Sequence, residues 1–220
     1  MNILGIDYSL NGSSMIFGDL DGIKDYRFFS KLKSDIKNPK CVEILEEYNG
    51  EQKLDNMICY LLSRIKDVDL IVLESASFNS NNASSDFKAG YHIIKYLCRR
   101  LDVKCLEVPP ISNKLFFTED AKADKNKMVD VAMSKYSEDI NFDNISKKHR
   151  EDVADALSLY ELGQKYIKCK RLPARKGCID TSDIKYFETL PLHQQQVIAK
   201  LYNREDLYKE IVKKRNKLKK

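Results

Sequence analysis

The chain has 220 residues, 43% of them hydrophobic and 10% aromatic, so it is apolar enough for one globular domain with an extension and is not a disordered protein. No apolar run approaches the length of a membrane-spanning helix, and we recognise no signal peptide. We therefore expect a cytoplasmic protein, of a bacterial cell or of the host cell of a phage or virus, that is not secreted and does not contact a membrane.

The formal net charge of +5 is unevenly distributed along the sequence. Residues 165–220 contain 16 Lys and Arg and 6 Asp and Glu, a net charge of +10, so the first 164 residues carry a net charge of −5. An acidic body with a basic tail is common in enzymes that act on nucleic acids. A solvated basic helix explains the same charge equally well.

The first part of the sequence predicts three strands and a helix. Residues 2–7 are an apolar run that ends on Asp7, and residues 13–30 have the pattern of two strands joined by a turn at 19–22. A charged linker then leads to residues 51–66, where apolar side chains recur at helical spacing.

The middle of the sequence repeats the pattern of a buried strand that ends in a carboxylate. Residues 68–75 are apolar and carry Glu74, and a third core strand over 103–110 is stopped by two prolines. Helices are expected at about 86–101, 111–117, 124–137 and 148–167. This order predicts an α/β fold with a mixed five-stranded sheet flanked by helices. The tail is expected to hold one or two further helices and a frayed basic end.

Four carboxylates are predicted to lie at the edge of the sheet where catalytic groups are found in open α/β folds. Asp7 and Glu74 lie at the carboxyl ends of apolar strands, where ligands bind in open sheets. Asp152 and Asp155 are three residues apart and share one helix face, with His149 at its edge. Carboxylates side by side repel one another, and a divalent cation removes that repulsion. Each residue alone also fits a turn or a helix start, but the set suits two Mg²⁺ ions and phosphodiester hydrolysis.

The sequence resembles the RuvC-type Holliday junction resolvases of the RNase H-like, or retroviral integrase, superfamily. Motifs in the family's order are ILGIDYS, IVLES with a loop ending in NASSDFKAG, PPISNK, ADKNKM and HREDVADAL. The resemblance implies an RNase H-like nuclease domain over residues 1–165. A basic, mostly helical extension over 166–220 has no counterpart in the short bacterial form. The implied activity is that of a crossover junction endodeoxyribonuclease, which cuts four-way and other branched DNA in recombination and repair.

The resemblance also implies roles for individual residues. The catalytic ligands of two Mg²⁺ ions, for which Mn²⁺ would substitute, would be Asp7, Glu74, Asp152 and Asp155. His149 would take a secondary place near the second metal ion. Contacts with DNA would come from Lys114, Lys125, the additional Lys127 and, at the junction centre, Phe78.

Members of this family act as homodimers, so the resemblance implies a two-fold dimer on a four-way junction. We expect the helix 86–101 to form the interface through Phe87, Tyr91, Ile94 and Leu97, unless these residues pack on the sheet. The basic extension is expected to contact the DNA backbone, to pack against the core or to join the dimer interface.

Three other functions remain open. One is an RNase H-like nuclease for RNA or RNA–DNA hybrids, and another is a junction-binding protein without catalysis. The third is an ATPase of the actin-like fold, since GIDYSLNGSS also suits a first phosphate loop. The chain has only eight glycines, and we find no second phosphate loop and no adenosine motif. We therefore expect no nucleotide cofactor.

Overall fold

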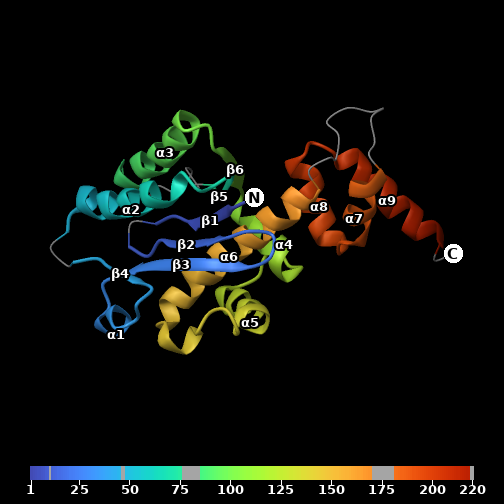
Figure 1. Cartoon of the computed structure of the whole chain (residues 1–220). Helices are drawn as coiled ribbons and strands as arrows, with labels where there is room; N and C mark the ends of the chain where they lie inside the picture. Colours follow the sequence, from blue (N-terminus) through green and yellow to red (C-terminus); the bar gives the residue numbers. More distant parts are fainter. Residues whose placement is uncertain (10, 46–47, 76–84, 170–180, 219–220) are drawn as a thin grey trace.

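A mixed sheet forms the centre of the computed structural model, which describes all residues except 10, 46–47, 76–84, 170–180 and 219–220 (Figure 1). The strand order is β4-β3-β2-β1-β5-β6. The predicted strands are β1 (Ile3–Asp7), β2 (Ser14–Gly18), β3 (Ile23–Ser30), β5 (Leu70–Glu74) and β6 (Lys104–Val108). β1 to β3 form an antiparallel meander, and β5 and β6 continue the sheet parallel to β1. The predicted α/β architecture is confirmed.

The sheet has six strands in the described part of the chain, one more than the sequence predicted. The additional strand is β4 (Cys41–Glu43), which pairs in parallel with the end of β3. It follows α1 (Lys33–Ile36), so the charged linker contains two short elements. Three partly exposed residues are too few to show an alternating pattern, so this strand could not be predicted from the sequence.

Helices cover both faces of the sheet. α2 (Gly50–Ile65) and α3 (Ser85–Arg100) lie on one face. α4 (Pro110–Thr118), α5 (Lys125–Tyr136) and α6 (Lys147–Lys168) lie on the other, with a short 3₁₀ turn at Phe142–Asn144 between α5 and α6. Strand side chains alternate between two buried clusters, because successive residues of a strand point to opposite faces. Leu4 and Ile6 pack under α2 and α3, and Ile3 packs under α6.

α6 lies directly on the backbone of β1. A Cβ atom at Gly5 would stand 2.5 Å from the carbonyl oxygen of Ala156 and 2.6 Å from the amide nitrogen of Tyr160. Those atoms belong to the helix backbone and have little room to move, so only glycine permits this approach. The close packing sets the height of α6 above the end of β1.

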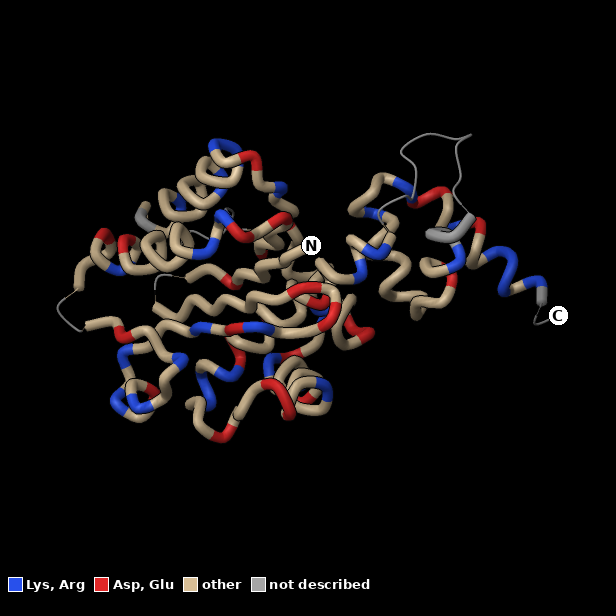
Figure 2. The backbone as a smooth tube through the Cα atoms, in the orientation of Figure 1, with Lys and Arg blue, Asp and Glu red and all other residues tan. Residues whose placement is uncertain are grey.

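The extension contains three described helices, α7 (Thr181–Thr189), α8 (Leu192–Leu201) and α9 (Glu205–Leu218). The expectation of one or two helices with a frayed end is therefore wrong, because α9 continues to Leu218. The first half of α9 is anchored in the extension, where Leu207 and Ile211 are buried. Figure 2 shows basic residues along the outer part of α9.

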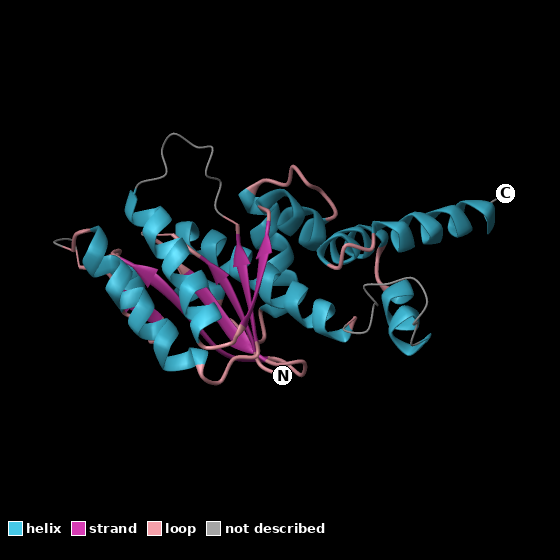
Figure 3. Cartoon of the chain, turned by 90° about the horizontal axis from the view of Figure 1, so that it is seen from above, coloured by secondary structure: helices cyan, strands magenta, loops and turns pink. Residues whose placement is uncertain are grey.

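The extension packs against the body, which is one of the alternatives that the sequence left open. The ring of Tyr202 stacks on that of Tyr166 in α6 at a centroid distance of 4.2 Å, and its hydroxyl donates to the Tyr166 carbonyl at 2.7 Å. Gln194 donates to the carbonyl of Phe116 in α4 at 3.5 Å. Figures 1 and 3 both place the extension beside the sheet, beyond the C-terminal end of α6.

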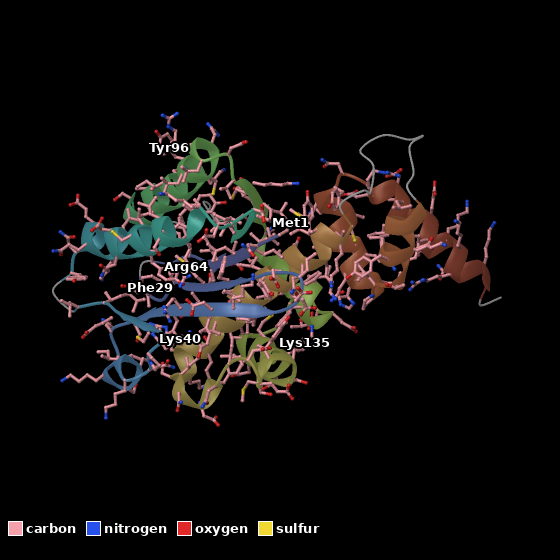
Figure 4. The ribbon with its side chains drawn as sticks, in the orientation of Figure 1. Met1, Phe29, Lys40, Arg64, Tyr96 and Lys135 are labelled. Carbon is pink, nitrogen blue, oxygen red and sulfur yellow. The ribbon has the colours of Figure 1, made fainter. Side chains whose placement is uncertain are left out.

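The residues expected at a dimer interface on α3 face the chain's own sheet instead. Tyr91 and Ile94 are at most 1% exposed, and Phe87 and Leu97 pack against the same buried cluster. The expectation is therefore wrong for Tyr91 and Ile94, because helical periodicity alone does not tell which neighbour an apolar face meets. Tyr96 is on the outer side of α3, 62% exposed, and points away from the body (Figure 4). Within the described residues, no helix is long and apolar enough to cross a membrane.

Candidate active site

The two strand-end carboxylates stand next to each other. β1 and β5 are parallel neighbours with Ile6 opposite Leu73, so the next residues, Asp7 and Glu74, reach the same level. Side chains two residues apart on a strand share a face. Asp7 therefore follows Ile3 and Gly5 on the face that α6 covers, and Glu74 follows Leu70 and Val72 on the same face.

α6 brings the other two predicted carboxylates to this edge of the sheet. Ala156 lies over Gly5, and the preceding turn of the helix carries Asp155 and Asp152 toward Asp7. All four carboxylates are partly exposed, so solvent and a substrate can reach them. The structure thus brings together residues that are up to 148 positions apart in the sequence, as predicted from the strand ends and the helix spacing.

The four carboxylates form one electrostatic group. Burial raises the pKa of Asp7 well above its ordinary value, and the charges of Asp155, Glu74 and Asp152 raise it further. Burial and then the charge of Glu74 raise the pKa of Asp155 to about 7. Burial also raises the pKa of Glu74, against a hydrogen bond from Asn113 and the charges of two lysines. Ionising the whole group therefore costs free energy unless a cation is present.

Two of the three lysines predicted to contact DNA are close enough for their charges to affect the four carboxylates. Lys114 on α4 and Lys125 at the start of α5 both oppose the rise in the pKa of Glu74 and of Asp155. Lys125 also pairs with Glu151 at 2.9 Å, and its side chain is 61% exposed. Lys127 lies two residues further on, toward the other side of the helix, and pairs with Asp120 at 3.6 Å. Phe78 falls outside the described residues.

Asn113 is a site residue that sequence reasoning missed. Its side chain is fully buried, and its Nδ2 donates to Glu74 Oε2 at 3.2 Å and to the carbonyl of Asp155 at 3.5 Å. Its Oδ1 accepts from the hydroxyl of Ser158. The amide therefore links β5 to α6 and orients Glu74. The available signal was its position beside Lys114, after the two prolines that start α4.

His149 lies beside Asp152, on the edge of the face where the sequence predicted it. Its Nδ1 is 2.9 Å from Asp152 Oδ2, and the side chain is 1% exposed. A fully buried histidine that contacts a half-buried carboxylate is held in one orientation.

The chemistry of these donors fits Mg²⁺, which prefers carboxylate oxygens. Gly12 brings the backbone close to two of these side chains, since a Cβ atom there would stand 2.7 Å from Asp152 Oδ2 and 3.1 Å from His149 Cε1. In the described part of the chain, no group of three or more His, Cys, Asp or Glu side chains is already gathered to hold a metal ion.

Gly12→Ala is expected to reduce divalent-metal binding and any metal-dependent activity at least about tenfold, with little loss of stability. The new methyl group displaces the flexible end of the Asp152 side chain, 2.7 Å away, whereas the His149 ring at 3.1 Å has to shift only slightly. Isothermal titration with Mg²⁺ and a thermal melt measure the two effects. The matched control is Gly22→Ala, where a Cβ atom meets nothing within 4 Å. Unchanged Mg²⁺ affinity in Gly12→Ala would place the metal site elsewhere.

Comparisons with known proteins support the fold rather than the details of the site. No protein-family model matches the sequence, and no curated protein matches it. A structure of Thermus thermophilus RuvC matches with a TM-score of 0.53 and 12% identity, covering 73% of this chain and 91% of that chain. The chain adopts the RuvC fold. A structure of T. thermophilus RuvC in complex with a Holliday junction substrate matches with the same score and identity and with 90% of that chain covered. The RuvC fold implied by the sequence motifs is confirmed.

Proposed function

We propose that the protein is a Mg²⁺-dependent, structure-selective DNA endonuclease that resolves four-way and other branched junctions. The observation that carries the proposal is the convergence of Asp7, Glu74, Asp152 and Asp155 at one edge of a RuvC-type sheet. Four carboxylates that raise one another's pKa add nothing to the packing of the core. A site that hydrolyses phosphodiesters with divalent cations, in contrast, requires such a group of ligands. The match to a RuvC structure that contains a Holliday junction supports branched DNA as the substrate class.

In this proposal the four carboxylates hold two Mg²⁺ ions, with His149 beside Asp152, and Mn²⁺ substitutes for Mg²⁺. The ions, when bound, supply Lewis-acid stabilisation of the charge that develops during phosphodiester hydrolysis. The charges of the other three carboxylates all raise the pKa of Asp7, so Asp7 is close to each of them. It is therefore the residue best suited to bind both ions. Asn113 keeps Glu74 oriented toward α6.

The lysines would bind the DNA backbone around the carboxylates. Lys114 and Lys125 are close enough to affect the pKa of Glu74 and Asp155, so they would meet phosphates next to the cleaved bond. Lys127 and Phe78 remain proposed DNA contacts from the sequence. A two-fold homodimer would match the two-fold symmetry of a four-way junction and produce paired cuts.

A cleavage assay on a synthetic four-way DNA junction tests this function. Linear duplex of the same sequence and an RNA–DNA hybrid serve as matched substrates, each with Mg²⁺, Mn²⁺ or EDTA. We expect paired, symmetric nicks in the junction with either metal and no cutting in EDTA. Faster cutting of the hybrid would favour an RNase H-like activity. Tight junction binding without cutting in any divalent metal would make the protein a junction-binding protein without catalysis.

A further inference from the structure

Basic side chains gather on a surface from which the sequence predicted no DNA contact. The surface combines the linker that follows β3 with the first turn of α6. Its five exposed lysines, which we name the basic platform, are Lys31, Lys33, Lys37, Lys147 and Lys148. Figure 2 shows basic residues on α1 and at the start of α6, at the same end of the sheet. This concentration contrasts with the net charge of −5 on the first 164 residues.

Buried side chains fix the two halves of the basic platform to each other. Asp35 is 1% exposed and accepts hydrogen bonds at 2.8 Å from the backbone N–H and the hydroxyl of Ser146, as well as from the hydroxyl of Ser30. Asn38 adds a second link, since its Nδ2 donates to the carbonyl of Asn144 at 3.1 Å. The lysines of the linker and those of α6 therefore keep a fixed relative position.

A groove of about 540 Å³ runs between the two halves. Lys37 lines it from the linker, and Lys147 and Arg150 line it from α6. The two acids that border the groove are compensated, because Asp35 accepts three hydrogen bonds and Asp143 is 3.9 Å from Arg150. The groove therefore offers positive charge to an anionic ligand.

The stability of the fold does not explain these lysines. Among the residues that the structure describes, none of the five forms an ion pair with an acidic side chain. Lys147 and Lys148 lie in the first turn of α6, which contains no acidic residue, although the helix dipole favours acids and disfavours cations there. Residues that break a local rule without a structural gain are typical of functional sites.

The basic platform lies at the edge of the sheet that carries the four carboxylates. Asp7 pairs with Ser14, and Ser14 pairs with Phe28, so β3 leaves the sheet near the level of Asp7 and roughly 10 Å from β1. On α6, Lys148 precedes Asp152 by four residues, which places it on the same helix face about 6 Å along the axis. The lysines therefore border the candidate active site.

Lys114 lies on the other flank of the carboxylates. In the strand order β4-β3-β2-β1-β5-β6, Asp7 and Glu74 end the two strands β1 and β5. α4, which carries Lys114, follows β6 on one side, and the linker of the basic platform follows β3 on the other. Cations thus flank the carboxylates in both directions along one edge of the sheet.

We propose that the basic platform binds the phosphate backbone of DNA on the β3 side of the cut site, so that one strand is held on both sides of the cleaved bond. The proposal rests on the proposed function, because it takes the four carboxylates as the place of cleavage. Lys148 is about 10 Å along α6 from Asp155. It would meet a phosphate about three nucleotides from the cut, since the charges of one strand follow at about 3.4 Å along a duplex. Such contacts fix the position of the strand without reading its sequence.

The test replaces Lys37, Lys147 and Lys148 together by Gln in the full chain. Fluorescence anisotropy measures binding of a labelled four-way junction in EDTA, where it is not cut, between 50 and 200 mM salt. We expect the slope of log K against log salt to become shallower by about 2.7, so that the affinity advantage of the wild type shrinks about 40-fold over this range. The melting temperature should be unchanged or higher, because two cations leave the first turn of α6.

The matched control replaces three exposed cations at the opposite edge of the sheet by Gln. Lys66 precedes β5, and Arg99 and Arg100 end α3 shortly before β6. This variant has the same net charge as the platform variant, so a general effect of charge would weaken binding equally in both. We expect the control to keep the salt slope of the wild type.

A second measurement does not depend on how the platform variant folds. Three phosphates on one side of the mapped cut are replaced by uncharged methylphosphonates, first on one side and then on the other. We expect one of the two modified junctions to bind the wild type more weakly and to cause no further loss in the platform variant, because the contacts are already absent.

The outcomes separate this proposal from the proposed function. Junction cutting by the wild type, together with equal affinities and salt slopes in the platform variant and the control, would overturn the platform and leave the nuclease intact. A wild-type protein that binds the junction but cuts it in neither Mg²⁺ nor Mn²⁺ would overturn the proposed function, and with it the place of the platform beside a cleaved bond.

Discussion

Asp7→Asn is expected to abolish Mg²⁺-dependent junction cleavage while raising the melting temperature of the metal-free protein. The substitution removes the carboxylate that interacts with all three others, so the proposed metal site loses its central ligand. Junction binding should persist, because Asp7 is not among the proposed DNA contacts. The same change removes a half-buried negative charge, which both partial burial and the neighbouring carboxylates disfavour. We expect a gain on the order of 1–3 kcal/mol in the free energy of unfolding, or roughly 3–10 °C.

The gain should depend on pH and on metal. The pKa values of Asp7 and Asp155 are raised in the folded, metal-free protein, so this state binds protons that the unfolded chain has already released above about pH 4. The stability of the metal-free wild type therefore falls as the pH rises toward and through about 7, where Asp155 loses its proton. Asp7→Asn should stabilise more at pH 8 than at pH 5, and saturating Mg²⁺ should stabilise the wild type at pH 8.

Asp25→Asn is the matched control, because the same chemical change is made in a carboxylate that is compensated. Asp25 is paired with Lys40 at 2.6 Å and with Arg64 at 2.8 Å. Burial alone would raise its pKa, but the hydrogen bond from Lys40 and the nearby cations lower it. Asp25→Asn should therefore lose stability and keep junction cleavage. Thermal melts in EDTA at both pH values and the junction assay measure these effects. Wild-type cleavage by Asp7→Asn, or a lower melting temperature in EDTA at pH 8, would contradict the site.

Truncation after Lys168 is expected to destabilise the whole protein, with an effect larger than that of any single substitution above. α8 covers α4 and α6, and its Val197, Ile198 and Ala199 are at most 3% exposed. Removing the extension would expose Phe116 and Tyr166, which it covers. Each large apolar side chain returned to water costs about 1.5–3 kcal/mol, so a total of several kcal/mol is expected. α4 carries Asn113 and Lys114, so the damage would extend to the candidate active site.

A melt of the truncated chain against the full chain measures this loss. The deletion is therefore unsuited to testing whether the tail binds DNA, since weaker binding would follow from unfolding alone. A truncated chain that melts within about 2 °C of the full chain would contradict the packing role of α8, because several kcal/mol corresponds to a much larger shift for a chain of this size.

Charge substitutions on α9 test the proposed DNA contact of the extension without that disturbance. Lys213, Lys214 and Lys217 are exposed on α9, so replacing all three by Gln should leave the packing unchanged. Lys168 lies about 20 Å along α6 from Asp155, at a rise of about 1.5 Å per residue, so the tail would meet a junction arm away from the cut site. If all three lysines contact phosphates, the slope of log K against log salt should become shallower by about 2.7. An unchanged slope would leave the extension a structural role alone.

The sequence by itself determined the elements and the candidate ligands of this protein. Apolar runs ending on Asp7 and Glu74 predicted strand ends with carboxylates, and the three-residue spacing of Asp152 and Asp155 predicted a shared helix face. These patterns are local, because each depends on a few consecutive residues. The motif order then led to the RuvC fold, although the matching structures are only 12% identical.

Only the tertiary structure decided how distant residues meet. The β1–β5 register aligns Asp7 with Glu74, and the missing side chain of Gly5 lets α6 approach β1. Asn113 gains its role from Glu74 and Asp155, 39 and 42 positions away, and no local pattern encodes such contacts. The sequence also did not determine where the extension packs, because its contacts with α4 and α6 join residues that are far apart in the sequence. Apolar periodicity shows that a helix face is buried, but its partner depends on which surfaces of the complete fold remain to be covered.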